Sequence, residues 1–488
     1  MIENILDNIK ALGLEKDLRE SLIGVEVEEH RLLESGTLSK YPYPTELGSR
    51  LFHPYLQSDF AESQNEIISD AHSRVHNTAV QLNAIQNVLC DHLKKDEVIW
   101  PLSMPPILSA SDIKFIDDNF YRPAYAKYRD YLTDKYGIPK KIITGVHINF
   151  SVSKPFLESL FSAYQPEYSD FTAFKNDFYF QLIQNFVLHR YVLTYLFGAS
   201  PIFEQGFLTH KSELTHPVRS IRNSSLGYVN NPEDKVNVGV YSSMDHLISA
   251  LEDAIETHRL YSPAEFYGPV RMRGQNHFTE YPKKGINYLE FRVFDNDPFD
   301  ANGVSAETMA FVKKWLAYLI TLPVNESTIS ADLKQSFSYN DKVALEDPNS
   351  HSALEERMRA IFEDFLQTGT KLGFDSRELA LINKMNDRVA NPASTPAAKL
   401  ASHIKNDSLV EYATKLAKQH KQLRKEKNID RFGLPANVQS FIKNCIRDGV
   451  SYQILEDSQL GLKYQDKKLV VKYEDLTPTI VLEPVKLF

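Results

Sequence analysis

Apolar and polar residues alternate along three separated stretches of the chain. In GVEVEEHRL (24–32), Val25 and Val27 share one parity, and Glu26 and Glu28 share the other. The stretches KIITGVHINFSV (141–152) and INYLEFRVFD (286–295) repeat this alternation. Because successive side chains of a β-strand point to opposite faces, each stretch predicts a strand with one buried face and one polar face.

Other parts of the chain show the spacing of amphipathic helices. The first 23 residues look helical, and a long helix is expected from Asp59 to about His92. Its apolar residues recur three or four positions apart, at Val75, Ala79, Leu82, Ile85 and Leu89. We expect this helix to begin in SDFAESQNE (58–66), which would place Glu62 and Glu66 one turn apart. After about residue 300 the chain is strongly helical.

These elements predict an α+β protein, in which an antiparallel sheet packs helices on one side and opens the other side to substrate. We expect one catalytic domain over residues 1–450, helical from about residue 300, and a short strand-rich tail over 451–488. The basic run KQHKQLRKEKN (418–428) is interpreted as a solvated helix face.

Composition excludes several classes of function. The 488 residues carry a net charge of -9 and a sequence pI near 6.0, which argues against nucleic-acid or anionic-membrane binding. No apolar run approaches the roughly 20 residues of a membrane-spanning helix, and no signal peptide is evident. We therefore expect a cytoplasmic protein. We also expect it to be a monomer. The two cysteines, Cys90 and Cys445, are interpreted as inert core thiols.

The polar faces of the predicted strands carry carboxylates. Glu26 and Glu28 lie on one face about 7 Å apart and would repel each other by roughly 2 kcal/mol. Further acids are Asp59, Glu62, Glu66 and Glu290, and His147 shares the polar parity of its strand. If these groups converge, a hard cation such as Mg²⁺ or Mn²⁺ would hold them. The alternative is that they are unrelated surface acids.

Arginines complete the candidate chemistry. Arg219, Arg222, Arg271, Arg273 and Arg292 offer guanidinium groups that suit carboxylates and phosphates. Acids for metals beside arginines for anions are what an ATP-dependent ligase of amino acids needs. No Gly-rich phosphate loop occurs, so metals and basic side chains would have to hold the phosphates of a bound nucleotide. No GxSxG or HExxH motif occurs either, which disfavours a protease or an esterase.

Several motifs, taken in order, resemble one family. They are GVEVEEHRL, HPYLQSDFAESQNEII, WPLSMPP, KYGIPKKIITGVHINFS, YLFGASP, RSIRNSSLGY, FYGPVR and INYLEFRVFDNDPF. Together they resemble glutamate–cysteine ligase of the bacterial type. The resemblance implies a glutamine-synthetase-like fold, a curved antiparallel sheet that forms a funnel wrapped by helices. It also implies ATP-dependent joining of L-glutamate, through a γ-glutamyl phosphate, to L-cysteine, the first step of glutathione synthesis.

The resemblance further implies residue roles. Magnesium ligands would be Glu26, Glu28, Asp59, Glu66, His147 and Glu290, with manganese as the other possible ion. Arg292 and Glu290 would be catalytic, Arg292 facing the transferred phosphoryl group. The amino-acid substrates would meet Arg129, Asn149, Arg222, Tyr228, Tyr267 and Arg271. Glu62 is a weaker match, and strand parity sets Glu29 apart from the pair before it.

The end of the chain resembles the first portion of the fused bacterial enzyme that makes glutathione in one chain. The sequence stops at Phe488, before any ATP-grasp module, so we expect no second ligation to glycine. Two alternatives stay open. A related carboxylate–amine ligase would join glutamate to another amine, and a non-catalytic relative would act as a binding subunit.

Overall fold

A computed structural model describes residues 2–120, 122–165, 167–207, 214–426, 434–455, 457–476 and 484–487. Its main sheet is antiparallel, in the order β2-β3-β1-β5-β7-β6, and β4 pairs with β1. Its strands are β1 Leu22–Leu33, β2 Leu56–Ser58, β3 Gln64–Ile68, β4 Glu97–Trp100, β5 Val146–Ser151, β6 Val270–Arg273 and β7 Tyr288–Phe294. Since β2 and β6 end the order without pairing with each other, the sheet is open. The predicted α+β class is confirmed.

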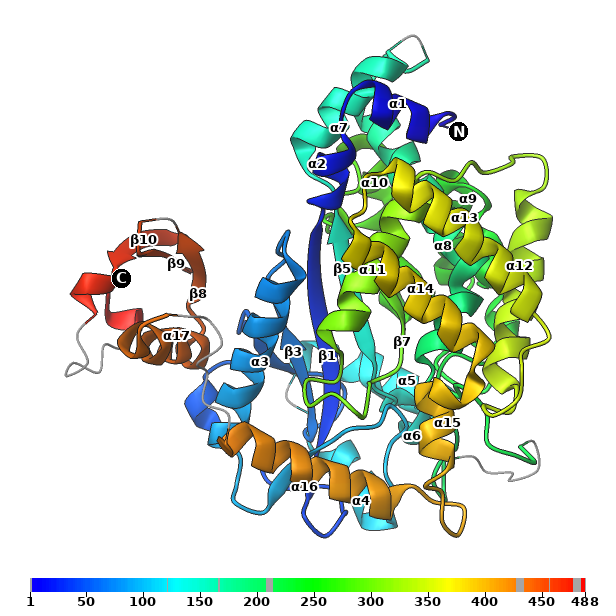
Figure 1. The fold of residues 1–488 in the computed structure, drawn as a ribbon. Helices are drawn as coiled ribbons and strands as arrows, with labels where there is room; N and C mark the ends of the chain where they lie inside the picture. Colours follow the sequence, from blue (N-terminus) through cyan, green and yellow to red (C-terminus); the bar gives the residue numbers. More distant parts are fainter. Residues whose placement is uncertain are drawn as a thin grey trace.

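Helices surround this sheet (Figure 1). The N-terminal half contains α1 Ile5–Ala11, α2 Glu15–Arg19, α3 Val75–His92, α4 Ala110–Asp118, α5 Ala126–Tyr136, α6 Ile138–Lys141, α7 Lys154–Phe161 and α8 Phe171–Phe197. The remainder contains α9 Met244–Glu256, α10 Tyr281–Lys284, α11 Ala306–Ile320, α12 Ile329–Leu345, α13 Glu355–Lys371, α14 Ser376–Ala390, α15 Pro396–Ala401, α16 Val410–Glu426 and α17 Ala436–Asp448. The strongly helical character expected after residue 300 is present.

The apolar parity of the central strands forms the core. Val25, Val27 and Ile148 are fully buried, and they belong to one cluster with residues of α3, α8 and α11. Burying each such side chain contributes roughly 1.5–3 kcal/mol to the stability of the folded state. The face that carries these apolar residues therefore packs against the helices. The polar residues of these strands point to the opposite face of the sheet, where the candidate site residues lie.

The helix predicted from Asp59 begins instead at Val75, and this prediction was wrong over its first half. Residues 64–68 form β3, which pairs with β1 and β2. Here Ile67 is fully buried, while Glu66 lies opposite Glu28 on the polar face. Backbone pairing on both sides of this segment outweighs its helical pattern, because hydrogen bonding within a sheet overrides weak local propensity. Glu62 and Glu66 are therefore not on one helix.

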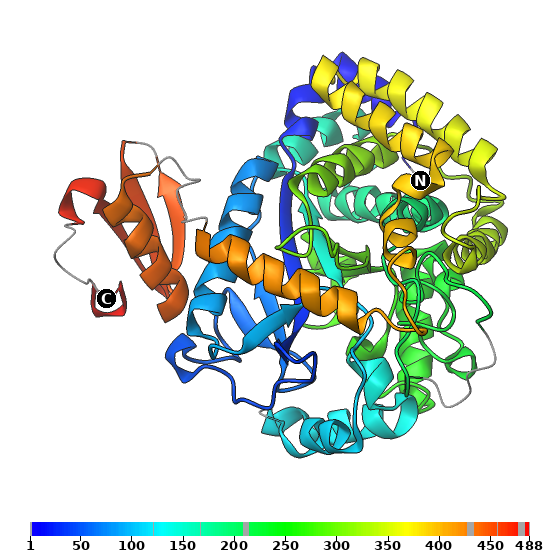
Figure 2. The same ribbon diagram turned by 60° about the horizontal axis from the view of Figure 1, so that its bottom comes forward.

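A small unit near the C-terminus stands beside α3 (Figures 1 and 2). It contains α17 and a three-stranded antiparallel sheet of β8 Ser451–Leu455, β9 Gln459–Tyr464 and β10 Lys467–Lys472. The backbone N–H of Tyr452 donates to the hydroxyl of Tyr55 at 3.1 Å, which joins this unit to the main body. The strand-rich character expected for 451–488 is present in its described residues, and the domain boundary at 450 stays a prediction.

Among the described residues, no helix has the length and apolar character needed to cross a membrane.

A buried ion pair ties β1 to β4. Arg31 Nη1 lies 2.9 Å from Glu97 Oε1, and the two side chains are 0% and 1% exposed. Removing one partner of such a pair typically lowers the free energy of unfolding by about 3–5 kcal/mol, because the other charge stays buried without a counter-charge. We expect Glu97→Gln to lower the melting temperature measurably by circular dichroism.

The matched control is Glu158→Gln, which breaks the exposed pair with Lys154, whose side chains are 51% and 75% exposed. Exposed pairs contribute about 0–1 kcal/mol, so little change is expected in this variant. Equal melting shifts for the two variants would contradict the role given to Arg31 and Glu97.

Candidate active site

The register of the sheet brings distant residues onto one polar face. Glu26 on β1 lies opposite His147 on β5, and Glu28 lies opposite Glu66 on β3. Asn149 on β5 lies opposite Glu290 on β7. The predicted strand faces therefore share one surface, and residues more than 260 positions apart in the chain become neighbours.

Three ligand-type side chains meet at the centre of this face. The ligand atoms of Glu26, His147 and Glu290 all lie within 4.8 Å of one another. His147 Nδ1 is 3.3 Å from Glu26 Oε2 and 3.5 Å from Glu290 Oε1. Asn149 Nδ2 donates to Glu26 Oε1 at 2.8 Å, which holds that carboxylate in place. This arrangement suits a single cation.

A second group of acids adjoins this centre. Burial raises the pKa of Glu66 well above its usual value, and the charges of Glu26, Asp59 and Glu28 raise it further. Burial also raises the pKa of Glu28, with His147 opposing and Asp59 adding to the effect. These carboxylates repel one another in a buried place, which is unfavourable unless positive charge lies between them.

These residues fit a magnesium ion. Carboxylate oxygens are the donors that Mg²⁺ prefers. The buried Nε2 of His147 has no hydrogen-bond partner among the described residues, and it lies 3.7 Å from Glu28 Oε1. A buried ring nitrogen without a partner, lying between carboxylates, is compatible with a cation that these residues would hold together.

Arginines flank the cluster on its β6–β7 side. Glu290 accepts hydrogen bonds from Arg292 Nη1 and Arg273 Nε. Burial opposes ionisation, but the guanidinium groups of Arg292 and Arg273 hold the pKa of Glu290 well below its usual range. Arg292 Nη2 also donates to the Tyr228 hydroxyl at 3.5 Å. The result is a fixed cation directly beside the candidate metal centre.

The wall beyond Arg292 is aromatic and carries a lysine. The rings of Tyr228 and Tyr267 lie 4.6 Å apart between centroids. Lys141 Nζ donates to the Tyr267 hydroxyl and lies 4.0 Å from the centre of that ring. Sequence analysis gave Lys141 no role. The signal that could have found it is its position in KKIITGVH, a few residues before the strand that carries His147.

The side chain of Arg222 reaches the polar face of the sheet by passing close to Gly145. Its Nη1 donates to the carbonyl oxygen of Arg292 at 2.9 Å. A Cβ atom on Gly145 would come within 2.2 Å of the Arg222 guanidinium, so only glycine leaves room for this side chain. The close approach places Arg222 behind Arg292.

Other candidates lie away from the acid cluster. Arg129 donates to the carbonyl oxygen of Ile116 and packs over Phe60 and Phe120, so its guanidinium is occupied at the α4–α5 region. Its substrate role stays a prediction. Glu62 accepts from Arg50 and from the Tyr43 backbone.

Two further arginines donate hydrogen bonds to loops around the site. Arg271 pairs in register with Glu290, and its guanidinium donates to the carbonyl oxygens of Ala264 and Phe266. Arg219 donates to the carbonyl oxygens of Pro348 and Ser350. These contacts hold loops around the site.

Lys141 yields a stability prediction. Burial lowers its pKa to about 7, from 10.5 in an exposed chain. Between these values the unfolded chain binds more protons, so stability rises with pH. We expect Lys141→Met to be more stable than the parent protein at pH 6 by on the order of 2 kcal/mol, and the difference to shrink toward pH 10.

Urea unfolding across this pH range would measure the effect, with the exposed Lys127→Met on α5 as control. A difference for Lys141→Met that does not change with pH would contradict the burial of a charged lysine here.

The fold and this face define a class of protein. An open antiparallel sheet, backed by helices, gathers carboxylates for cations and arginines for anions on one surface. A family model of glutamate–cysteine ligases matches residues 6–264 and 257–343. The chain therefore belongs to the glutamate–cysteine ligase family.

Known relatives agree with this assignment. The chain is 36% identical over 461 residues to the glutathione biosynthesis bifunctional protein GshAB of Streptococcus thermophilus, covering 93% of this chain and 60% of that protein. It is 31% identical over 468 residues to the protein of the same name from Enterococcus faecalis, covering 94% and 61%. The chain thus spans about 60% of the length of these curated relatives.

Solved structures show the same fold. A bifunctional glutathione synthetase from Pasteurella multocida superposes with a TM-score of 0.86 at 29% identity, covering 95% of this chain and 61% of that chain. A glutamate–cysteine ligase from Francisella tularensis in complex with AMP has a TM-score of 0.74 at 22% identity, covering 87% and 92%. The second likeness concerns the fold alone.

Proposed function

We propose that this protein joins the γ-carboxylate of L-glutamate to the amine of L-cysteine with consumption of ATP. The products are γ-glutamylcysteine, ADP and phosphate. The observation that supports the proposal most strongly is the placement of Arg292 and Glu290 beside the acid cluster on one polar sheet face. Family membership and the names of the relatives, which concern glutathione biosynthesis, favour the same reaction.

The reaction proceeds in two displacements. An oxygen of the glutamate γ-carboxylate attacks the γ-phosphorus of ATP, and ADP leaves. The cysteine nitrogen then attacks the acyl carbon, phosphate leaves with one former carboxylate oxygen, and the nitrogen releases a proton. Both steps develop negative charge on phosphoryl oxygens, so fixed positive charge at that place lowers the barrier.

The acids would hold magnesium, either as one ion or as neighbouring ions. The proposed ligands are Glu26, Glu28, Asp59, Glu66, His147 and Glu290. When bound, magnesium neutralises phosphate charge and offsets the repulsion among these acids. Asn149 keeps Glu26 oriented by its hydrogen bond of 2.8 Å.

Arg292 supplies positive charge to the transferred phosphoryl group. Glu290 and Tyr228 fix its guanidinium from two sides. Burial alone would lower the pKa of Arg292, but the negative charge of Glu290 outweighs burial and raises that pKa, so Arg292 stays protonated. Because its orientation is set before substrate arrives, little reorganisation is needed during reaction. Arg222, Tyr228, Tyr267 and Lys141 form the adjoining wall, where the amino-acid carboxylates would bind.

A panel of amines tests the substrate. The assay is magnesium-dependent ADP release with ATP, L-glutamate and each amine in turn, together with mass detection of the product. We expect L-cysteine to give the highest kcat/KM. Equal or faster turnover with another amine would favour the alternative, a related carboxylate–amine ligase. Absence of magnesium-dependent ADP release with every amine would reject the enzyme proposal.

We also propose that the protein acts in the cytoplasm as a monomer without nucleic-acid partners. The net charge of -9 supports the last point. Light scattering coupled to size exclusion tests the monomer, whose expected mass is 55.9 kDa. A mass near twice this value would reject it.

A further inference from the structure

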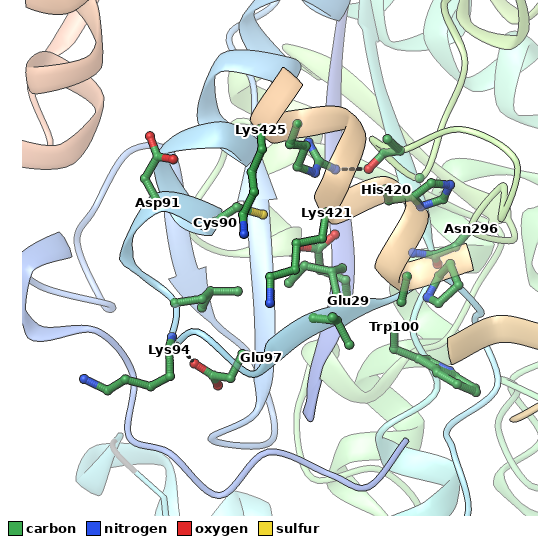
Figure 3. A pocket seen from close by; sticks show the side chains of 18 of the residues that line it. Glu29, Cys90, Asp91, Lys94, Glu97, Trp100, Asn296, His420, Lys421 and Lys425 are labelled. Atoms are coloured by element: carbon green, nitrogen blue, oxygen red, sulfur yellow. Dashed lines mark hydrogen bonds between the residues drawn. The ribbon is translucent and has the colours of Figure 1, made fainter. Parts of the chain in front are cut away.

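A cavity lies beside β1 and β4, and α16 forms another of its walls (Figure 3). Its volume is about 240 Å³, and its walls come from β1, β4, the C-terminal end of α3, the loop before α11, and α16. Figures 1 and 2 show α16 crossing the body at this place. Because adjacent strand residues point to opposite faces, Glu28 faces the acid cluster and Glu29 faces this cavity.

Glu29 brings a buried carboxylate to the cavity. The residue is 3% exposed, and its Oε2 accepts a hydrogen bond of 2.7 Å from Gln86 Nε2. Its other oxygen, Oε1, has no hydrogen-bond partner within the described part of the chain. A buried acceptor left without a partner is costly, and native proteins almost always supply one. A ligand that carries a hydrogen-bond donor would give Glu29 Oε1 the hydrogen bond that it lacks.

The opposite wall of the cavity is basic. Lys421 and Lys425 reach from α16 into it, as Figure 3 shows, and Lys94 and Lys95 also line it. Lys421 also bonds Glu34 Oε1 at 2.7 Å, and Arg424 bonds Asn302 and the carbonyl oxygen of Ala301, so these side chains anchor the helix. Lys425 forms no hydrogen bond or ion pair with the described residues.

These contacts correct the interpretation of the basic run as a solvated helix face. Ala413 and Ala417 of α16 are buried beside Val98 and Trp100 of β4. Lys421 and Arg424 are partly buried, whereas Lys418 and Gln422 are exposed. In the part of the run that the structure describes, Lys418 and Gln422 are therefore solvated, whereas the residues that line the cavity are His420, Lys421, Arg424 and Lys425. Lys427 and Asn428 of the run lie outside the described residues.

A metal ion is a poor match for this cavity, although Cys90 and His420 also line it. No three ligand atoms of the described cavity residues lie within 4.8 Å of one another, as those of Glu26, His147 and Glu290 do on the other face of the sheet. A small organic molecule fits better, since 240 Å³ equals the volume of about eight liquid waters.

We propose that this cavity is a second ligand site, which binds a small α-amino acid. The ammonium group of the ligand donates to Glu29 Oε1, and its carboxylate meets the ammonium groups of Lys421 and Lys425. A zwitterion meets both walls of the cavity. A simple anion would leave Glu29 Oε1 without a donor, and a simple amine would leave Lys425 without an ionic partner, since Lys421 already pairs with Glu34. The proposal does not depend on the proposed ligase reaction.

Isothermal titration calorimetry tests this site. The standard L-amino acids other than glutamate and cysteine are titrated one at a time into the full chain. We expect at least one to bind with one-to-one stoichiometry. Lys425→Ala and Glu29→Gln should each weaken that binding by about tenfold or more. The matched control is Lys415→Ala, an exposed lysine of the same helix that does not line the cavity, and it should bind normally.

Two further probes distinguish the ligand chemistry, namely inorganic phosphate and the decarboxylated amine of the best-binding amino acid. Both should bind at least tenfold more weakly than the amino acid. Binding of phosphate with equal strength, or binding that survives both Lys425→Ala and Glu29→Gln, would overturn the proposal, as would no binding by any amino acid. Lys425→Ala should keep the parent ADP-release rate and melting temperature, and the melting temperature should also show that Glu29→Gln is folded.

Discussion

Glu290→Gln is expected to lower kcat at least about 1000-fold, which corresponds to about 4 kcal/mol of transition-state stabilisation. The carboxylate of Glu290 accepts from Arg292 and Arg273 and lies 3.5 Å from His147. Glutamine keeps the shape of the side chain but removes its charge. Arg292 then loses its ionic partner, and the candidate metal centre loses a ligand, so both sources of charge stabilisation weaken together.

The measurement is steady-state ADP release at saturating ATP, glutamate and cysteine. The matched control is Glu252→Gln, the same substitution at an exposed position of α9, which should keep the parent rate. Circular dichroism melting shows that Glu290→Gln is folded at the assay temperature. A folded Glu290→Gln variant within tenfold of the parent kcat would remove Glu290 from the catalytic machinery.

Glu66→Gln is expected to reduce activity by about 100-fold or more and, without divalent cations, to raise the melting temperature. Burial and the neighbouring acids raise the pKa of Glu66, so the folded state holds this proton more tightly than the unfolded state. The stabilisation from that proton is fully present at pH values below 4.5, the ordinary pKa of a glutamate, and it is lost as the pH rises through the raised pKa of Glu66. Glutamine cannot ionise and avoids this loss.

The experiment compares melting temperatures at pH 8 in EDTA and in excess magnesium. In EDTA we expect the variant to melt about 2 °C above the parent protein. Magnesium should stabilise the parent more than the variant, because a ligand that binds only the folded state stabilises it more when it binds more tightly. Equal magnesium shifts, or a lower melting temperature for the variant in EDTA, would show that Glu66 does not belong to a repulsive cation site.

Strand alternation was the most informative pattern in this chain. It identified the polar faces of three strands, and the structure places Glu26, Glu28, His147, Asn149, Glu290 and Arg292 together on one surface. The helical pattern was less reliable. Residues 64–68 were expected in a helix and form β3, because β1 and β2 pair with them on both sides.

Residues outside the alternating strands were harder to place. Lys141 was missed because a lysine near the end of a short helix has the local pattern of a surface residue. Its burial depends on Tyr228 and Tyr267, which lie far along the chain. Arg129 was found from its motif rather than from strand alternation. Its guanidinium bonds to Ile116 and Asp117, and its substrate role stays a prediction.

The amino-acid sequence by itself determined which residues share a strand face, because side chains alternate with a period of two whatever the neighbouring strands are. Only the tertiary structure decided which strands are adjacent and in what register, since pairing depends on long-range contacts that a local pattern does not contain. That register sets Glu28 against Glu66 on one face. It also leaves Glu29 facing the other way, where α16, almost 400 residues later, closes a basic cavity over it.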